Sequence, residues 1–143
     1  MQLSQHFTLE EMTFSETAAR LGIDNTPPDD VVDTLRRTAA YLEDVRARLG
    51  VPLRISSGYR CLLLNRALRS KDTSQHVKGE AVDFVAPRFG APRQIVDTLA
   101  DSDVPFDQLI LEYGRWVHIS FSGGASPRRQ ALVIDQDGTR GFA

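Results

Sequence analysis

The N-terminal third of the chain has the apolar spacing of helices. Between residues 31 and 49, apolar side chains recur at steps of three and four, which places them along one stripe of a long helix. Thr26, followed by two prolines and two aspartates, predicts the N-terminal cap of this helix. Two shorter helices are expected before it, one starting at the capping-box pair Thr8 and Glu11 and one over residues 15–21. The first third of the chain is therefore predicted to be helical.

After residue 50 the spacing changes to the alternation of β-strands, interrupted by two short helices. Strands are predicted at residues 53–56, 81–85, 108–112, 116–121 and 131–135, and helices at residues 62–68 and from Pro92 onward. Helices followed by strands with short connections indicate an α+β fold, in which N-terminal helices pack on a small, mostly antiparallel sheet. A length of 143 residues fits one domain, so residues 1–143 are predicted to form a single domain.

Composition and charge exclude several classes of protein. Hydrophobic residues make up 41% of the chain and charged residues 25%, both near the globular average, which excludes a disordered chain. A net charge of −2 provides no basic field for a nucleic-acid partner. No apolar run approaches the length of a membrane span, and with Cys61 as the single cysteine no internal disulfide is expected. The oligomeric state is left open, with a monomer as the simplest expectation.

Polar side chains interrupt two otherwise apolar predicted strands. Asp83 lies within Ala-Val-Asp-Phe-Val and His118 within Trp-Val-His-Ile-Ser-Phe, while His76 lies in a polar loop before Asp83. An unpaired buried carboxylate is strongly unfavourable. Two histidines and a carboxylate are a common ligand set for catalytic zinc, and the metal would compensate the buried charge. The residues alone leave two alternatives open, an arginine paired with Asp83 and histidines that donate to backbone carbonyls.

A larger set of sequence motifs occurs in a characteristic order. The motifs are Ser56-Ser57-Gly58-Tyr59-Arg60, Asn65, Ser74-Gln75-His76, Gly79-Glu80-Ala81 with Asp83-Phe84, and Trp116-Val117-His118-Ile119-Ser120. Their order resembles the zinc D-alanyl-D-alanine carboxypeptidase superfamily, which includes VanX-type dipeptidases, phage L-alanyl-D-glutamate endopeptidases and the hedgehog signalling domain. Two further stretches, Phe7-Thr8-Leu9-Glu10-Glu11 and Asn25-Thr26-Pro27-Pro28, resemble its small phage and prophage-type members.

The resemblance implies a zinc peptidase fold with one zinc ion per chain, bound by His76, Asp83 and His118. It also implies that Arg60 steadies the substrate or the reacting carbonyl. A guanidinium fork suits a terminal carboxylate or a developing oxyanion. The alternative role for Arg60 is a structural ion pair with Asp83.

Several neighbours of these residues are expected to contact the substrate or support the site. The candidate substrate-binding residues are Arg60, Ser74, Gln75 and Trp116. Ser74 and Gln75 are also expected to orient the loop of His76 through hydrogen bonds, and Ser120 is expected to do the same for His118. Trp116 is expected to form a wall of the cleft, with a place in the core as its alternative.

The general base departs from the family pattern. In the carboxypeptidase and dipeptidase members, an acidic residue three positions before the last zinc histidine fills this role. Arg115 stands there in this chain and cannot accept a proton. Glu112 is the nearest upstream carboxylate, and hedgehog-type domains place their acidic residue at a similarly longer spacing. Glu112 is therefore the candidate base, provided that Gly114 permits a tight turn; the alternative is a solvated charge at a strand end.

These expectations together predict a zinc metallopeptidase that hydrolyses stem peptides of peptidoglycan. The reaction is expected to be of the D,D-carboxypeptidase type, or of the L,D or L-alanyl-D-glutamate endopeptidase type found in bacteriophage endolysins. The alternatives are a non-catalytic zinc-binding phage structural or cell-wall-binding module, which Arg115 favours, and a metal-free structural domain. No signal peptide is recognisable, so we expect synthesis in the cytoplasm and action at the cell wall only after release or export.

Overall fold

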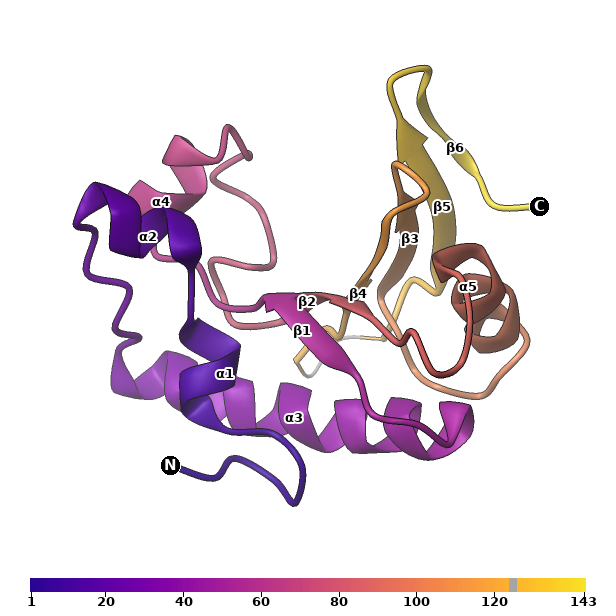
Figure 1. Ribbon diagram of the computed structural model, residues 1–143, viewed down its shortest axis with the longest axis horizontal. Helices are drawn as coiled ribbons and strands as arrows, with labels where there is room; N and C mark the ends of the chain where they lie inside the picture. Colours follow the sequence, from indigo (N-terminus) through magenta and orange to yellow (C-terminus); the bar gives the residue numbers. More distant parts are fainter. Residues whose placement is uncertain (124–125) are drawn as a thin grey trace.

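The computed structural model describes residues 1–123 and 126–143, in which five helices accompany one six-stranded sheet (Figure 1). The helices are α1 (Leu9–Thr13), α2 (Glu16–Leu21), α3 (Asp29–Leu49), α4 (Leu62–Ala67) and α5 (Pro92–Ala100). The strands are β1 (Arg54–Ser57), β2 (Ala81–Val85), β3 (Gln108–Glu112), β4 (Trp116–Ser120), β5 (Gln130–Asp135) and β6 (Gly138–Gly141). Within this described part, no helix has the length and apolar character needed to cross a membrane.

The strands follow the order β1-β2-β4-β3-β5-β6 across the sheet. β3 and β5 run parallel, and the other neighbouring pairs are antiparallel. The predicted α+β class with a mostly antiparallel sheet is therefore confirmed. The sequence pattern does not predict β6, because all its residues are exposed and none forms an apolar alternation. β6 exists because the chain turns back along β5 at Gly138, whose φ of 108° favours glycine.

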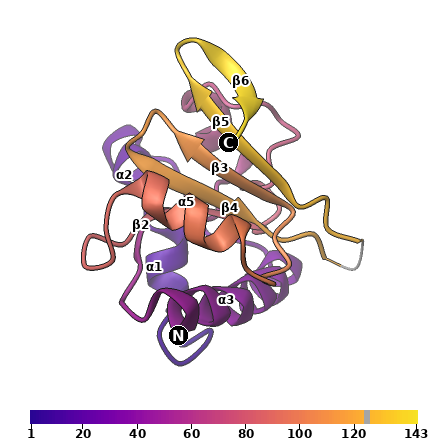
Figure 2. The same cartoon turned by 90° about the vertical axis from the view of Figure 1, so that its right-hand side faces the viewer.

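One face of the sheet is apolar and packs on α3 and α5 (Figure 2). Phe84 of β2 lies opposite Val117 of β4, and both side chains are fully buried. The helix side chains in this core include Leu35, Ala39, Leu42, Val45 and Leu49 of α3, Ile95, Val96 and Leu99 of α5, and Met12 of α1. Because successive residues of a strand point to opposite faces, Asp83 and His118 project from the other face.

Helix α3 begins later than the predicted cap at Thr26 implies. Its N-cap is Pro28, which has extended backbone and makes no side-chain capping bond. The hydroxyl of Thr26 donates instead to Asp24 Oδ1 at 2.6 Å. A residue before proline is driven out of the helical conformation, so the helix starts only after the second proline. The predicted cap is therefore wrong, whereas the apolar stripe along α3 is confirmed.

Candidate active site

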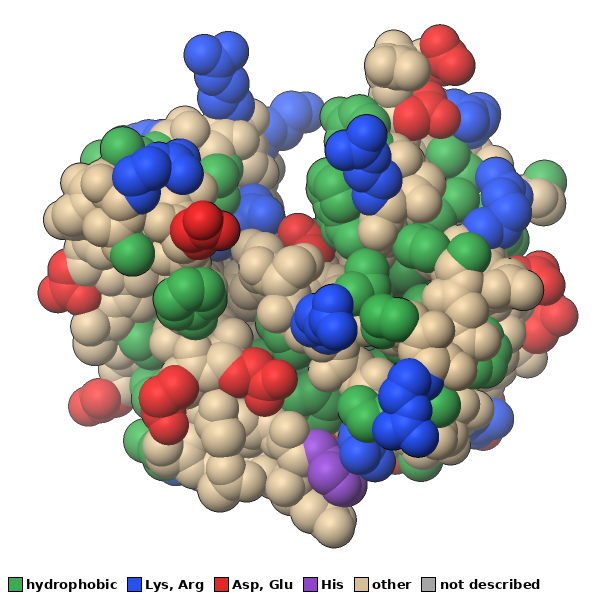
Figure 3. Space-filling model, viewed as in Figure 1, with side chains coloured by type: hydrophobic (Ala, Val, Ile, Leu, Met, Phe, Trp, Pro, Cys, Tyr) green, Lys and Arg blue, Asp and Glu red, His purple; other side chains and the backbone are tan. Residues whose placement is uncertain are grey.

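The centre of the site lies where β2 and β4 pair. Asp83 and His118 are direct partners in the antiparallel register, so both side chains leave the sheet on the face away from α3 and α5. His118 Nδ1 lies 3.0 Å from Asp83 Oδ1. On this side the surface is hollowed between the lobe with α2 and α4 and the lobe with β3, β5 and β6 (Figure 1, Figure 3). The two side chains therefore project toward a cleft.

His76 reaches the same point from the turn that precedes β2. Its ring Nδ1 donates to the carbonyl oxygen of Gly58 at 2.7 Å, and this bond places the proton on Nδ1 because a carbonyl only accepts. Nε2 is then directed at Asp83 Oδ1, 3.3 Å away. The backbone N–H of His76 donates to Ser74 Oγ at 3.2 Å, so Ser74 helps to shape the turn. Histidine ligands of metals are commonly oriented in this way, with one ring nitrogen facing the metal and the other donating to a carbonyl oxygen.

His76, Asp83 and His118 form a compact cluster of donors. The three donor atoms lie within 4.8 Å of one another, and all three residues are buried. Burial lowers the pKa of His76. Burial also opposes ionisation of Asp83, but the two histidine rings beside its carboxylate outweigh it and hold the pKa of Asp83 well below its usual range. A carboxylate and two imidazoles that can present lone pairs are the donors that zinc prefers, so the residues present fit this metal.

Arg60 approaches the cluster from the loop after β1. Its Nη2 lies 3.3 Å from Asp83 Oδ2, so the ion pair named as its alternative role is present. Nε donates to Ser57 Oγ at 3.1 Å, and Nη1 lies 3.5 Å from Asn65 Oδ1. Burial lowers the pKa of Arg60, against the attraction of Asp83 and Glu112, and the guanidinium stays cationic at neutral pH. Sequence reasoning gives Ser57 and Asn65 no role of their own, although both belong to the ordered motifs that point to the site.

Glu112 ends β3 directly before the turn to β4. Tyr113 and Gly114 have φ values of 54° and 64°, and the Arg115 N–H donates to the carbonyl oxygen of Glu112 at 3.0 Å. This tight turn places Glu112 Oε1 3.6 Å from His118 Nδ1. Burial, together with a neighbouring carboxylate, raises the pKa of Glu112. Arg115 is exposed at the turn. Glu112 lies on the face of the donor cluster, close to His118.

Trp116 lies beside Glu112, its partner in the register of β3 and β4, and is half-buried. Its ring centroid is 5.7 Å from that of Tyr113. Its buried Nε1 makes no hydrogen bond of ordinary geometry with any described residue. The N–H is nevertheless close enough to Glu112 to lower the pKa of its carboxyl, against the larger effect of burial. Ser120 Oγ accepts a hydrogen bond from the backbone N–H of Gln108 at 3.0 Å. From the sequence, Ser120 is expected to orient His118 instead.

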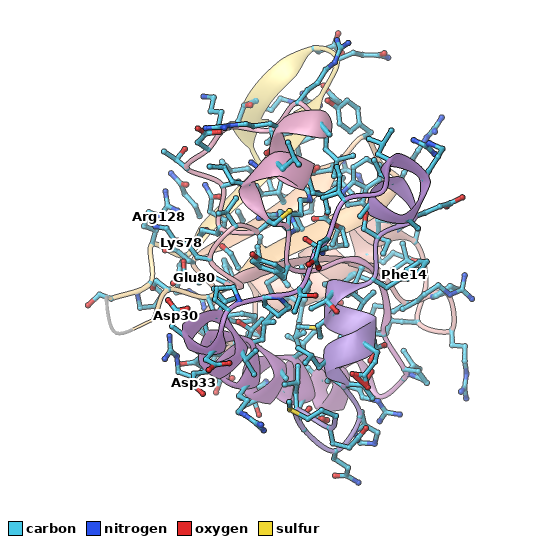
Figure 4. The ribbon with its side chains drawn as sticks, turned by 90° about the vertical axis from the view of Figure 1, so that its left-hand side faces the viewer. Phe14, Asp30, Asp33, Lys78, Glu80 and Arg128 are labelled. Carbon is cyan, nitrogen blue, oxygen red and sulfur yellow. The ribbon has the colours of Figure 1, made fainter. Side chains whose placement is uncertain are left out.

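Gln75 joins the His76 loop to a charged network on one flank of the molecule. Its Nε2 donates to Glu80 Oε1 at 3.3 Å and to Asp107 Oδ2 at 3.1 Å. Arg128 Nη2 donates to the same Asp107 oxygen at 2.7 Å. Glu80 and Arg128 lie on one side of the molecule (Figure 4). The amide nitrogen of Gln75 therefore anchors the loop, and its contact with substrate stays a prediction.

A hollow of about 580 Å³ lies away from this cluster, between α5 and the turns that join β3 to β4 and β5 to β6. Leu111 and Val133 line it and are partners in the β3–β5 register, on the sheet face that packs against the helices. His76, Asp83 and His118 are not among its lining residues. The donor cluster, and not the volume of a cavity, locates the candidate active site.

A comparison with protein families agrees with this geometry. The family model described as Peptidase M15 matches residues 5–120, which is most of the chain. No curated protein matches the chain. M15 peptidases are zinc enzymes, in agreement with the cluster of His76, Asp83 and His118. The chain belongs to the peptidase M15 family and is a metallopeptidase by that membership.

Proposed function

We propose that this protein is a zinc metallopeptidase that hydrolyses peptide bonds in the stem peptides of bacterial peptidoglycan. The observation that carries the proposal is the position of Glu112, whose carboxylate lies 3.6 Å from His118 Nδ1 on the face of the donor cluster. Hydrolysis of a peptide bond needs a proton acceptor close to the reacting atoms, and Glu112 supplies one. Membership of the M15 family supports peptides as the substrate class.

His76, Asp83 and His118 would hold the zinc ion. When bound, zinc supplies a Lewis acid that polarises the scissile carbonyl and makes water more acidic. Three protein donors are the number found in catalytic zinc sites, whereas structural sites use four. The hydrogen bond from His76 Nδ1 to Gly58 fixes the ring, so its Nε2 is already oriented before any metal binds.

Glu112 would act as the general base and then as the general acid. It would accept a proton from the attacking water and pass it to the nitrogen of the leaving amine. Burial and the negative charge of Asp83 raise the pKa of Glu112. A raised pKa suits a carboxylate that has to take up a proton and release it again near neutral pH.

Arg60 would hold an oxygen of the substrate. Its guanidinium is fixed between Ser57 and Asp83 and presents a fork that matches carboxylates and carbonyls. If it binds a terminal carboxylate, the enzyme removes the last D-alanine as a carboxypeptidase. If it binds a carbonyl within the chain, the enzyme is an L,D or L-alanyl-D-glutamate endopeptidase. In either case we propose that the protein acts at the cell wall after release or export.

Mass spectrometry of purified peptidoglycan fragments, incubated with the zinc-loaded protein, tests the function and identifies the bond that is cut. Glu112→Gln is expected to keep the fold and the zinc while lowering the rate by roughly two to four orders of magnitude, the usual contribution of a general base. Glu16→Gln makes the same chemical change at an exposed position of α2 and is expected to retain the wild-type rate.

The competing function is a non-catalytic zinc module, favoured by Arg115 at the position of the usual base. If this alternative is correct, the wild-type protein binds zinc but cleaves none of the peptidoglycan fragments. If the wild-type protein cleaves the fragments and Glu112→Gln is equally active, the protein is a peptidase but Glu112 is not its general base.

A further inference from the structure

Asn25 holds the chain on both sides of Arg60. It belongs to the Asn-Thr-Pro-Pro stretch between α2 and α3 and is half-buried. Its Nδ2 donates to the carbonyl oxygens of Thr13 at 2.8 Å and of Tyr59 at 3.0 Å. Its Oδ1 accepts the backbone N–H of Cys61 at 2.7 Å. A single side chain therefore bonds the residue before Arg60 and the residue after it.

These three bonds require a carboxamide at this position. The side chain has to donate twice and accept once, and asparagine carries two N–H groups and one carbonyl oxygen on a short stem. Aspartate would keep an acceptor for Cys61 but would turn its second oxygen toward the carbonyls of Thr13 and Tyr59. Alanine would remove the partner of all three backbone groups. Asn25 is thus matched to its place by chemistry as well as by size.

The segment that Asn25 holds is also bonded to the candidate zinc site. The Arg60 N–H donates to the carbonyl oxygen of His76 at 3.1 Å. In return, His76 Nδ1 donates to the carbonyl oxygen of Gly58 at 2.7 Å. Residues 58–61 therefore lie between the N-terminal segment, to which Asn25 binds them, and the histidine of the donor cluster.

We propose that Asn25 is a positioning residue that sets the place of the Arg60 guanidinium beside Asp83. The inference rests on the proposed function, in which Arg60 contacts the substrate. Arg60 Nη2 lies 3.3 Å from Asp83 Oδ2, and the reach of this long side chain depends on where its backbone is held. A misplacement of about 1 Å at a reacting group lowers rates steeply. Removal of Asn25 would therefore slow the reaction while the three metal donors stay in place.

A double-mutant cycle on the zinc-loaded protein tests this coupling in the peptidoglycan assay. Asn25→Ala is expected to lower kcat/KM roughly 10- to 100-fold with zinc content unchanged, the usual effect of removing a residue that orients a site. In an Arg60→Ala background the same change is expected to lower kcat/KM less than about threefold, because the group through which Asn25 acts is gone. Thr26→Ala removes a neighbouring hydroxyl that bonds Asp24 and is the matched control, expected to equal wild type.

Amide hydrogen exchange adds a readout that does not depend on activity. In Asn25→Ala, exchange at the backbone amides of Arg60 and Cys61 is expected to become at least roughly tenfold faster, with the amides of β2 and β4 unchanged. Thr26→Ala is expected to leave all of these rates as in wild type. If Asn25→Ala does not fold, Asn25→Asp takes its place in both measurements, because it keeps the acceptor for Cys61.

Two results would overturn the inference. If the two substitutions lower kcat/KM by independent factors, so that the double variant shows the product of both, Asn25 does not act through Arg60. Faster exchange spread through β2 and β4 would show that Asn25 supports the fold in general. A wild-type protein that cleaves no fragment refutes the proposed function instead, and hydrogen exchange then still decides whether Asn25 holds the Arg60 segment.

Discussion

Asp83 is the side chain on which the other charged groups of the site depend. Its carboxylate oxygens lie 3.3 Å from His76 Nε2, 3.0 Å from His118 Nδ1 and 3.3 Å from Arg60 Nη2. Without Asp83, the half-buried guanidinium of Arg60 would face two imidazoles and lose its ion-pair partner. One carboxylate therefore serves both as a candidate metal donor and as the counter-charge of Arg60, and its loss affects both functions.

Replacement of His76, Asp83 or His118 by alanine is expected to remove zinc and peptidase activity together, because a site with three protein donors has none to spare. Elemental analysis of the purified variants measures the zinc, and circular dichroism checks the fold. His6→Ala is the control. It removes an exposed histidine that lies far from β2 and β4 in the sequence, and it is expected to keep one zinc ion per chain. Tight, stoichiometric zinc in any of the three variants would show that the substituted residue is not a ligand.

The candidate ligands could be found from the sequence because polar groups inside apolar strands are unfavourable unless something compensates them. Asp83 and His118 stand out for this reason, and the order of the motifs adds His76. Asn25 and Asn65 could not be given their roles in the same way. Both are ordinary polar residues outside any apolar strand. The partners of Asn25 lie 12 to 36 residues away, and Asn65 bonds the nearby Arg60 and Lys71 across a loop, so neither set of hydrogen bonds leaves a periodic pattern.

At the scale of secondary structure, the contact between α1 and the loop after β1 controls part of the site. A Cβ atom added at Gly58 would lie 2.2 Å from the carbonyl oxygen of Met12, so only glycine permits this approach. The Tyr59 N–H donates to the same oxygen at 2.8 Å. Because Gly58 also accepts the bond from His76 Nδ1, the packing of α1 determines the place of a ring in the donor cluster.

Gly58→Ala is therefore expected to lower the free energy of unfolding by about 1–3 kcal/mol, the usual effect of overpacking, and to weaken zinc binding as well. Urea denaturation in the presence of a chelator measures the first effect, and zinc titration measures the second. Gly141→Ala is the control, since an added Cβ there meets no atom within 4 Å. Wild-type stability and zinc affinity in Gly58→Ala would contradict the close contact with α1.

The elements that bury an apolar face were predictable, and those defined by other contacts were not. The predicted helix at residues 62–68 corresponds to α4, and the predicted strand at residues 53–56 is found one residue later as β1. The start of α3 depends on the two prolines after Thr26, whose effect outweighs the capping preference of that residue. β6 is exposed along its length and is specified by its pairing with β5.

On the scale of the whole molecule, a charged network links segments that are far apart in the sequence. Asp107, which precedes β3, is buried and accepts hydrogen bonds from Arg128 and Gln75. The bonds from Arg128 lower the pKa of Asp107, against the effect of burial. The folded protein therefore favours the ionised form of Asp107 more strongly than the unfolded chain does.

This difference predicts how stability depends on pH. The contribution of Asp107 is complete above the unfolded-state pKa of about 3.9 and is lost as the pH falls through the lower folded-state pKa. Urea denaturation from about pH 6 to about pH 3 is expected to show a smaller loss of unfolding free energy in Asp107→Asn than in wild type. Asp97→Asn, at an exposed position of α5, is the control and should follow wild type. Parallel curves for wild type and Asp107→Asn would contradict the prediction.

The pairing of Asp83 with His118 also affects how reliably the chain finds its native sheet. A slip of one residue between β2 and β4 would turn one of these side chains toward α3, among Leu35, Ala39 and Leu42. Burial of a carboxylate or an imidazole among aliphatic groups is strongly unfavourable, so the misaligned sheet is destabilised even without metal. The residues that would serve catalysis thus also select the correct alignment of the strands. A chain with apolar residues at both positions would lose this selection and populate misaligned, aggregation-prone sheets during refolding.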